Sequence, residues 1–141
     1  MTTFSTLVFC FLCFAVSNAL MFGSEQRVIV KGRLMCGEKP ANNVQVKLYD
    51  IDTGFDDLMG QQRTNANGEF HIDGKTTEIT TIDPMLKIYH NCHDWKPCDR
   101  RIRIDIPTQY IGKSGQTPKT LDIGTWNLMQ YYKDEDRDCI H

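Results

Sequence analysis

The sequence predicts an all-β domain built as a seven-stranded β-sandwich with two disulfides. Apolar residues recur with period two rather than 3.6, and turn-forming residues separate these runs at short intervals. Four cysteines remain once an apolar N-terminal segment is set aside. The 141 residues suit one domain, and 40% hydrophobic residues with 10 Gly and 5 Pro are typical of a globular protein. We therefore expect one sandwich domain.

The first residues are typical of a secretory signal peptide. An uncharged apolar run covers residues 4–16, which is shorter than the roughly 20 residues that span a bilayer as a helix. Small residues follow at Ser17 and Ala19, as a signal peptidase requires, although no Lys or Arg precedes the run. A membrane anchor is the alternative, but no stop-transfer charge cluster follows. We expect a signal peptide over 1–19, a domain over 20–141 and a secreted chain that does not span the membrane.

The N-terminal half of the expected domain predicts four strands. In the first two, apolar core positions alternate with polar positions that face solvent. Gly37 to Pro40 form the turn between them, and Asn67-Gly68 supplies the positive-φ positions of a hairpin loop between the third and fourth. The four strands are expected at residues 28–34, 44–49, 58–64 and 69–72.

The C-terminal half predicts three more strands. Ile102, Ile104 and Ile106 are expected to face the core, and Pro107 ends their strand because it lacks an N–H. The only helical signal is a single turn near residues 109–111. The three strands are expected at residues 85–90, 101–106 and 120–128.

The expected domain contains four cysteines, Cys36, Cys92, Cys98 and Cys139. An even number in a secreted chain predicts two disulfides with three connectivities open, whereas the five residues between Cys92 and Cys98 fit a zinc site poorly. If seven strands alternate in direction, all four cysteines lie at one end of the sandwich. Local closure then favours Cys92–Cys98, and Cys36–Cys139 is left to fix the charged tail 133–138.

Charge excludes one class of partner and suggests others. With 16 Lys+Arg against 18 Asp+Glu the net charge is -2, which does not suit a protein that binds nucleic acid through bulk charge. Basic side chains on the solvent side of the first, second and sixth strands would form a patch for an acidic lipid, a glycan or a protein partner if those strands share one face; an ordinary solvated face is the alternative. The residues are Lys31, Arg33, Lys47, Arg101 and Arg103, with Lys96 and Arg100 at the entrance of the sixth strand.

Other candidate sites are less specific. Trp95, between Cys92 and Cys98, either packs on a disulfide or is presented to a partner. His90 and His93 could approach a metal, but this spacing also suits a polar hairpin tip. Four aspartates at 50, 52, 56 and 57 could suggest calcium, but they do not fit the twelve-residue calcium loop. No nucleophile or acid/base constellation stands out, so we expect neither a metal, nor a cofactor, nor an enzyme.

Several stretches resemble the nematode transthyretin-like family of small secreted proteins. They are residues 30–36, 46–50, 56–59, 76–84, 88–92, 96–98, 122–125 and 137–141. The resemblance covers essentially the whole expected domain and implies a transthyretin-like, or prealbumin-like, β-sandwich outside the cell. The hydroxyisourate hydrolases, which are similar in fold, end in Tyr-Arg-Gly-Ser, whereas this chain ends Asp138-Cys139-Ile140-His141.

The resemblance leaves the function open among three classes. Roles suggested for the family favour an extracellular binding module without catalytic activity, which recognises a ligand or bridges partners through a lipid headgroup, a glycan or a receptor. One alternative is a hydrolase that keeps the fold of the hydroxyisourate hydrolases but uses different residues. The other is a passive structural component of an extracellular layer.

Overall fold

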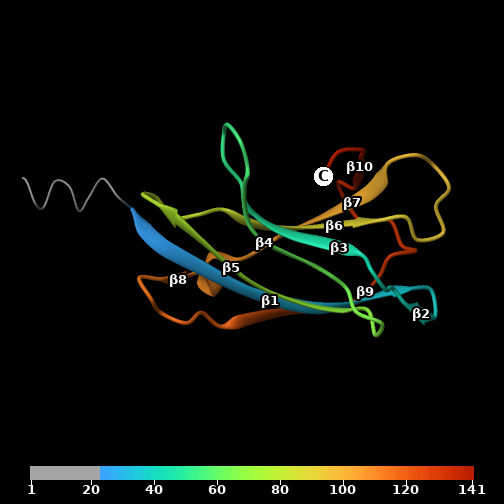
Figure 1. Ribbon diagram of the computed structural model, residues 1–141, viewed down its shortest axis with the longest axis horizontal. Helices are drawn as coiled ribbons and strands as arrows, with labels where there is room; N and C mark the ends of the chain where they lie inside the picture. Colours follow the sequence, from blue (N-terminus) through green and yellow to red (C-terminus); the bar gives the residue numbers. More distant parts are fainter. Residues whose placement is uncertain (1–22) are drawn as a thin grey trace, which may run out of the picture.

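The computed structural model describes residues 23–141 as two five-stranded β-sheets that pack face to face (Figure 1). The signal peptide expected over residues 1–19 lies outside the described part of the chain. Within residues 23–141 the structure has ten strands, one short 3-10 helix and no α-helix. None of these residues belongs to a helix that is long and apolar enough to cross a membrane.

The first sheet, sheet A, is organised around one long strand. β1 pairs with β5 antiparallel along one edge and with β9 parallel along the other. Two short strands, β2 and β8, add further antiparallel pairs to β1. The strands of sheet A are β1 (Ser24–Cys36), β2 (Lys39–Pro40), β5 (Glu69–Glu78), β8 (Gly112–Lys113) and β9 (Thr120–Asn127).

The second sheet, sheet B, is antiparallel throughout, in the order β10-β7-β6-β3-β4. The C-terminal strand β10 lies at one edge and β4 at the other. The strands are β3 (Gln45–Asp50), β4 (Asp57–Arg63), β6 (Pro84–His90), β7 (Asp99–Asp105) and β10 (Asp136–Asp138); the 3-10 helix η1 (Thr108–Tyr110) follows β7.

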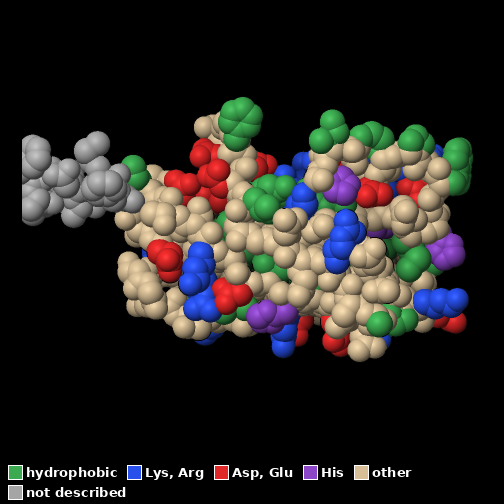
Figure 2. All heavy atoms as spheres, viewed as in Figure 1, with side chains coloured by type: hydrophobic (Ala, Val, Ile, Leu, Met, Phe, Trp, Pro, Cys, Tyr) green, Lys and Arg blue, Asp and Glu red, His purple; other side chains and the backbone are tan. Residues whose placement is uncertain are grey.

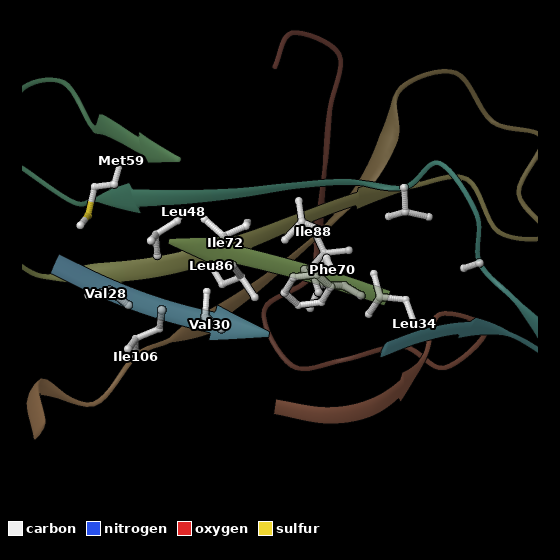
Figure 3. Packing of buried hydrophobic residues seen from close by; sticks show 14 of the residues in the cluster. Val28, Val30, Leu34, Leu48, Met59, Phe70, Ile72, Leu86, Ile88 and Ile106 are labelled. Carbon is white, nitrogen blue, oxygen red and sulfur yellow. The ribbon is translucent and has the colours of Figure 1, made fainter. Parts of the chain in front are cut away.

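The hydrophobic core fills the space between the two sheets (Figure 3). β1 contributes Val28, Val30 and Leu34, all of them fully buried, because every second side chain of a strand points to the same face. The facing strands of sheet B contribute, among others, Val46, Leu48, Leu86, Ile88 and Ile102. Ile29, which alternation places on the outer side, is nevertheless 7% exposed, since β5 and β9 flank it on both edges of β1.

A tight turn at residues 65–68 joins β4, which pairs with β3 in sheet B, to β5, which pairs with β1 in sheet A. The Asn65 side chain accepts hydrogen bonds from the N–H groups of Asn67 and Glu69, and Gly68 has φ 76°. A Cβ atom at Gly68 would collide with the carbonyl oxygen of Leu34 on β1. The turn is thus present where Asn67-Gly68 predicts it, but the hairpin prediction is wrong, because the two strands that the turn joins lie in different sheets; of the two residues, only the glycine adopts positive φ.

All seven predicted strands are present, together with three short ones, β2, β8 and β10. β5 extends six residues beyond its predicted end at residue 72. The helical turn expected near residues 109–111 is η1. The sandwich prediction is therefore confirmed, with a larger number of strands.

The predicted disulfide pairing is wrong. The bonds are Cys36–Cys92, between the two sheets, and Cys98–Cys139, which joins the residue just before β7 to the residue just after β10. The antiparallel register of β10 on β7 opposes Asp138 and Asp99, so the next residues, Cys139 and Cys98, meet. Cys139 therefore does fix the tail, as expected, but it does so at the edge of sheet B rather than at the end of the first strand.

Candidate ligand-binding groove

A polar groove lies on the outer face of sheet A. It has a volume of about 510 Å³, and its walls come from β1, β5, β9 and the end of β4. Alternation along β1 turns Val30 and Leu34 into the core, so Lys31 and Arg33 face outward into the groove. The groove is thus a consequence of the same period-two pattern that builds the core.

Side chains from neighbouring strands surround these two cations. In the register of sheet A, Lys31 lies between His71 of β5 and Asp122 of β9, and Arg33 lies opposite Glu69. Arg63, at the end of β4, adds a third cation to the lining. The groove therefore contains three fixed positive charges, two carboxylates and one histidine.

The three cations are not paired with carboxylates anywhere in residues 23–141. Arg33 donates through Nε to the carbonyl of Asn67 at 3.0 Å, and Arg63 donates to the carbonyl of Asn43 at 3.0 Å. These neutral acceptors orient the guanidinium groups, and neither group forms a direct ion pair among the described residues. Such an arrangement suits a ligand that carries negatively charged oxygens.

The bulge in β9 shapes the floor of the groove. The pairing of β9 with β1 shifts register between Lys31 and Arg33, and Gly124 there has φ 75°. Gly32 packs so closely on Ile123 that a Cβ atom would lie 2.5 Å from the isoleucine side chain. Glycine at position 32 therefore lets β9 approach β1 between the two outward cations.

The other predicted basic residues do not join Lys31 and Arg33, so the expectation of one patch is corrected. Lys47, Arg101 and Arg103 belong to sheet B, whose outer face is on the opposite side of the sandwich. Lys96 is exposed in the β6–β7 connection. A single patch requires that the strands which carry these residues lie in one sheet. The first of them is in sheet A, whereas the other two are in sheet B.

Arg100 is a structural residue, not a surface one. It is 3% exposed, and its guanidinium pairs with Glu135 and donates to the carbonyls of Leu128 at 3.0 Å and Gln130 at 2.9 Å. The Tyr131 ring covers it, with the ring centroid 4.0 Å from Cζ. Arg100 thus fixes the C-terminal segment against the sandwich.

Trp95 is presented to solvent. Its side chain is 87% exposed in the connection between β6 and β7, and no disulfide closes that connection on itself.

A second exposed aromatic residue, Phe55, lies in the β3–β4 loop, where it is 91% exposed. Figure 2 shows hydrophobic atoms at the tip of this loop, above a group of acidic side chains. No pattern in the sequence singles out Phe55, because a lone aromatic residue in a loop carries no periodic signal.

The acidic residues divide into two groups. Asp50, Asp57 and Glu78 place carboxylate oxygens within 4.8 Å of one another. Burial, followed by a hydrogen bond with Asp57 and the charge of Asp50, raises the pKa of Glu78. Asp56 instead pairs with Lys87 at 2.9 Å. Glu78 was missed from sequence because it reaches this loop from a different strand.

The two candidate metal-binding histidines have different environments. His93 is exposed, and its neighbours Cys36 and Cys92 are bonded to each other as a disulfide. His90 is 3% exposed, and its Nδ1 accepts a hydrogen bond from the Cys92 N–H at 3.1 Å. The proton of the neutral ring is therefore on Nε2, which has no partner among the described residues. Burial and then the charge of Arg100 lower the pKa of His90 to about 4.

We expect acidification to destabilise the fold through His90. Between an unfolded pKa of 6.5 and a folded pKa of about 4, the unfolded chain binds a proton that the native chain does not. The free energy of unfolding therefore falls as the pH drops from 7 to 4, by roughly 3 kcal/mol from this group. Urea unfolding at a series of pH values measures the change.

His90→Gln is the control, because an amide can accept the Cys92 N–H without titrating. The carboxylates of Asp94, Asp99 and Glu135 act on His90 in the opposite sense to Arg100, and all remain in the variant. The variant should therefore lose much of the decline between pH 7 and 4. An unchanged pH dependence would contradict the role of His90.

Comparisons with known proteins place the chain in a family. Residues 31–107 match the model of the Transthyretin-like family. The chain belongs to this family. Transthyretin-like protein 33 of Caenorhabditis elegans is 46% identical over 93% of this chain and 92% of its own length. Transthyretin-like protein 5 of the same organism is 45% identical over 92% of this chain and 96% of its own length.

The relatives of this transthyretin-like chain carry names that describe fold and family. Transthyretin-like proteins 2 and 1 of Caenorhabditis elegans are both 37% identical to this chain, and the alignments cover 90% and 84% of their own lengths. A solved 9R-lipoxygenase from Cyanothece is similar over 72% of this chain and 16% of its own, with 24% identity and a TM-score of 0.42, which is too weak to bear on function. The resemblance seen in the sequence motifs is thus confirmed at the level of the family.

Proposed function

We propose that this transthyretin-like chain is a secreted binding module without catalytic activity, which recognises an anionic ligand in the groove of sheet A. The observation that carries the proposal is that three cations, Lys31, Arg33 and Arg63, line one groove and form no ion pair with a carboxylate of residues 23–141. Location outside the cell rests on the N-terminal apolar segment of the sequence.

The chemistry of the groove favours sulfate or phosphate oxygens. Two of the cations are arginines, whose planar guanidinium groups bind such oxyanions through paired N–H donors. Glu69 and Asp122 lie beside the cations and would repel a ligand that is negatively charged along its whole length. The groove is therefore expected to distinguish ligands by the spacing of their negative charges as well as by their total charge.

We expect Lys31→Glu/Arg33→Glu to weaken binding to an oxyanion ligand at least tenfold. Two probes distinguish the source of the oxyanion: a short glycan that carries isolated sulfate groups, and vesicles in which an anionic phospholipid is diluted in neutral lipid. Binding is measured for each probe at two salt concentrations, because a charge-based contact weakens as salt rises.

Lys39→Glu/Lys119→Glu is the matched control, because it changes the net charge equally at exposed residues that do not line the groove. It should change binding less than twofold. Equal weakening by both double variants would assign the binding to overall charge and sink the groove proposal.

The hydrolase alternative is tested with the same protein. His71 lines the groove and is the histidine there that could take part in a reaction. Turnover of hydroxyisourate that disappears in His71→Ala would contradict a purely binding function. A protein that bound neither probe and retained no partner from extracellular fluid would favour the passive structural role.

A further inference from the structure

The outer face of sheet B carries a row of positive charges. Lys47 of β3 lies directly opposite Lys87 of β6, and Lys87 lies directly opposite Arg103 of β7. Like charges that face each other across neighbouring strands destabilise a sheet. This row therefore needs negative groups from elsewhere in the chain.

Segments outside the row supply those negative groups. Asp56, in the β3–β4 loop, pairs with Lys87 at 2.9 Å, and Asp136 of β10 pairs with Arg103 at 2.7 Å. Lys47 has no ion pair among the described residues, and its ammonium group lies 5.7 Å from the Tyr89 ring centroid. The β3–β4 loop thus balances Lys87, and the C-terminal segment balances Arg103.

The C-terminal segment binds the sheet as an extended acidic peptide would. β10 adds a strand to the edge of β7, as Figure 1 shows. Asp136 accepts two hydrogen bonds from the Arg101 guanidinium, at 2.8 and 2.5 Å, and Asp138 accepts a third at 2.8 Å. At the end of the chain, the His141 ring stacks on Tyr89 with 4.1 Å between centroids. Backbone pairing, paired charges and a stacked ring are features by which strand-adding peptides are recognised.

One covalent bond holds this segment in place. Cys139 of the Cys98–Cys139 disulfide is exposed to solvent. The two cysteines of the other disulfide, Cys36 and Cys92, instead pack against the hydrophobic core. A dithiol can attack the exposed bridge, transfer two electrons and two protons to form the Cys98 and Cys139 thiols, and close into its own disulfide. The tail would then be held only by non-covalent contacts.

We propose that the outer face of sheet B, along the edge of β7, is a docking surface for an extended acidic segment of a partner protein. The C-terminal segment of this chain occupies the surface until the Cys98–Cys139 bond is opened. This inference does not depend on the groove of sheet A, which lies on the other side of the sandwich.

A peptide with the sequence of residues 133–141, carrying serine in place of Cys139, is the probe. The full-length receptor is Cys98→Ser/Cys139→Ser/Asp136→Asn/Asp138→Asn, in which the tail is neither bonded nor charged at the two aspartates. We expect the peptide to bind this receptor at least tenfold more tightly than it binds the unmodified chain. A peptide with Asp136→Asn/Asp138→Asn should lose that binding, as should a receptor that also carries Arg101→Ala.

A second measurement covers the case in which the receptor variant does not fold. The unmodified chain is incubated with a dithiol until only the exposed bridge is reduced, as peptide mapping verifies, and binding of the same peptide is measured. Binding that appears on reduction supports the proposal. Failure of the peptide to bind either opened form, or equal binding to the closed chain, would overturn it. Dimers in which two chains exchange tails would overturn the assignment to a partner protein and identify a second copy as the occupant.

Discussion

Replacement of Arg100 by methionine is expected to lower the free energy of unfolding by about 3–5 kcal/mol. The side chains of Arg100 and Glu135 are only 4% and 7% exposed, so the variant leaves a carboxylate buried without its cation. The carbonyls of Leu128 and Gln130 lose their donor at the same time. Urea denaturation of the folded variant, followed by far-UV circular dichroism, measures the loss.

Two further variants test whether the loss comes from the buried, unpaired carboxylate or from the removal of a charge in general. Arg100→Met/Glu135→Leu removes both charges and should recover part of the stability, because no buried ion remains unpaired. Arg103→Met breaks an ion pair whose side chains are each 37% exposed, and should cost less than about 1 kcal/mol. Similar losses for Arg100→Met and Arg103→Met would show that the buried position of Arg100 does not matter.

Removal of the inter-sheet disulfide is the second large expected effect. Cys36→Ala/Cys92→Ala should lower the free energy of unfolding by about 4 kcal/mol, because the bond closes a loop over a sequence separation of 56 residues. Both cysteines also pack against the core, so the alanines remove buried contacts as well. Urea denaturation under non-reducing conditions gives the value.

The companion variant Cys98→Ala/Cys139→Ala provides the comparison. Its separation of 41 residues gives nearly the same entropic contribution, since the cost of loop closure varies only with the logarithm of length. It removes no core contact, and its loss should therefore be the smaller of the two. A peptide joining Cys36 to Cys139 in a non-reducing digest would contradict the pairing on which both predictions rest.

The strands could be predicted because their signal is local. Val28, Val30 and Leu34 alternate with outward side chains, and the same pattern marks β3 and β7. β2, β8 and β10 are two or three residues long, too short to show a period. The inward direction of Arg100 could also have been read, because it shares its parity with Ile102, which faces the core.

The candidate site could be predicted only in part. Lys31 and Arg33 were expected to face outward, and they do. Their companion Arg63 ends a strand of sheet B, and its place beside a groove of sheet A follows from how the two sheets pack, which no pattern in the sequence marks. The disulfide pairing failed for the same reason, since it depends on whether the tail joins β1 or β7.

The position of β1 at the centre of sheet A constrains how the chain acquires its structure during synthesis. β1 emerges early from the ribosome, but its parallel neighbour β9 lies far along the chain, as the contact of Gly37 with Asn127 across 90 residues shows. At about 5–20 residues per second, this interval lasts roughly 5–20 s. Throughout it, one edge of β1 lacks the partner strand β9, and pairing over such a distance is intrinsically slow. The nascent protein is therefore expected to rely on chaperones that bind exposed strands until its last third has been made.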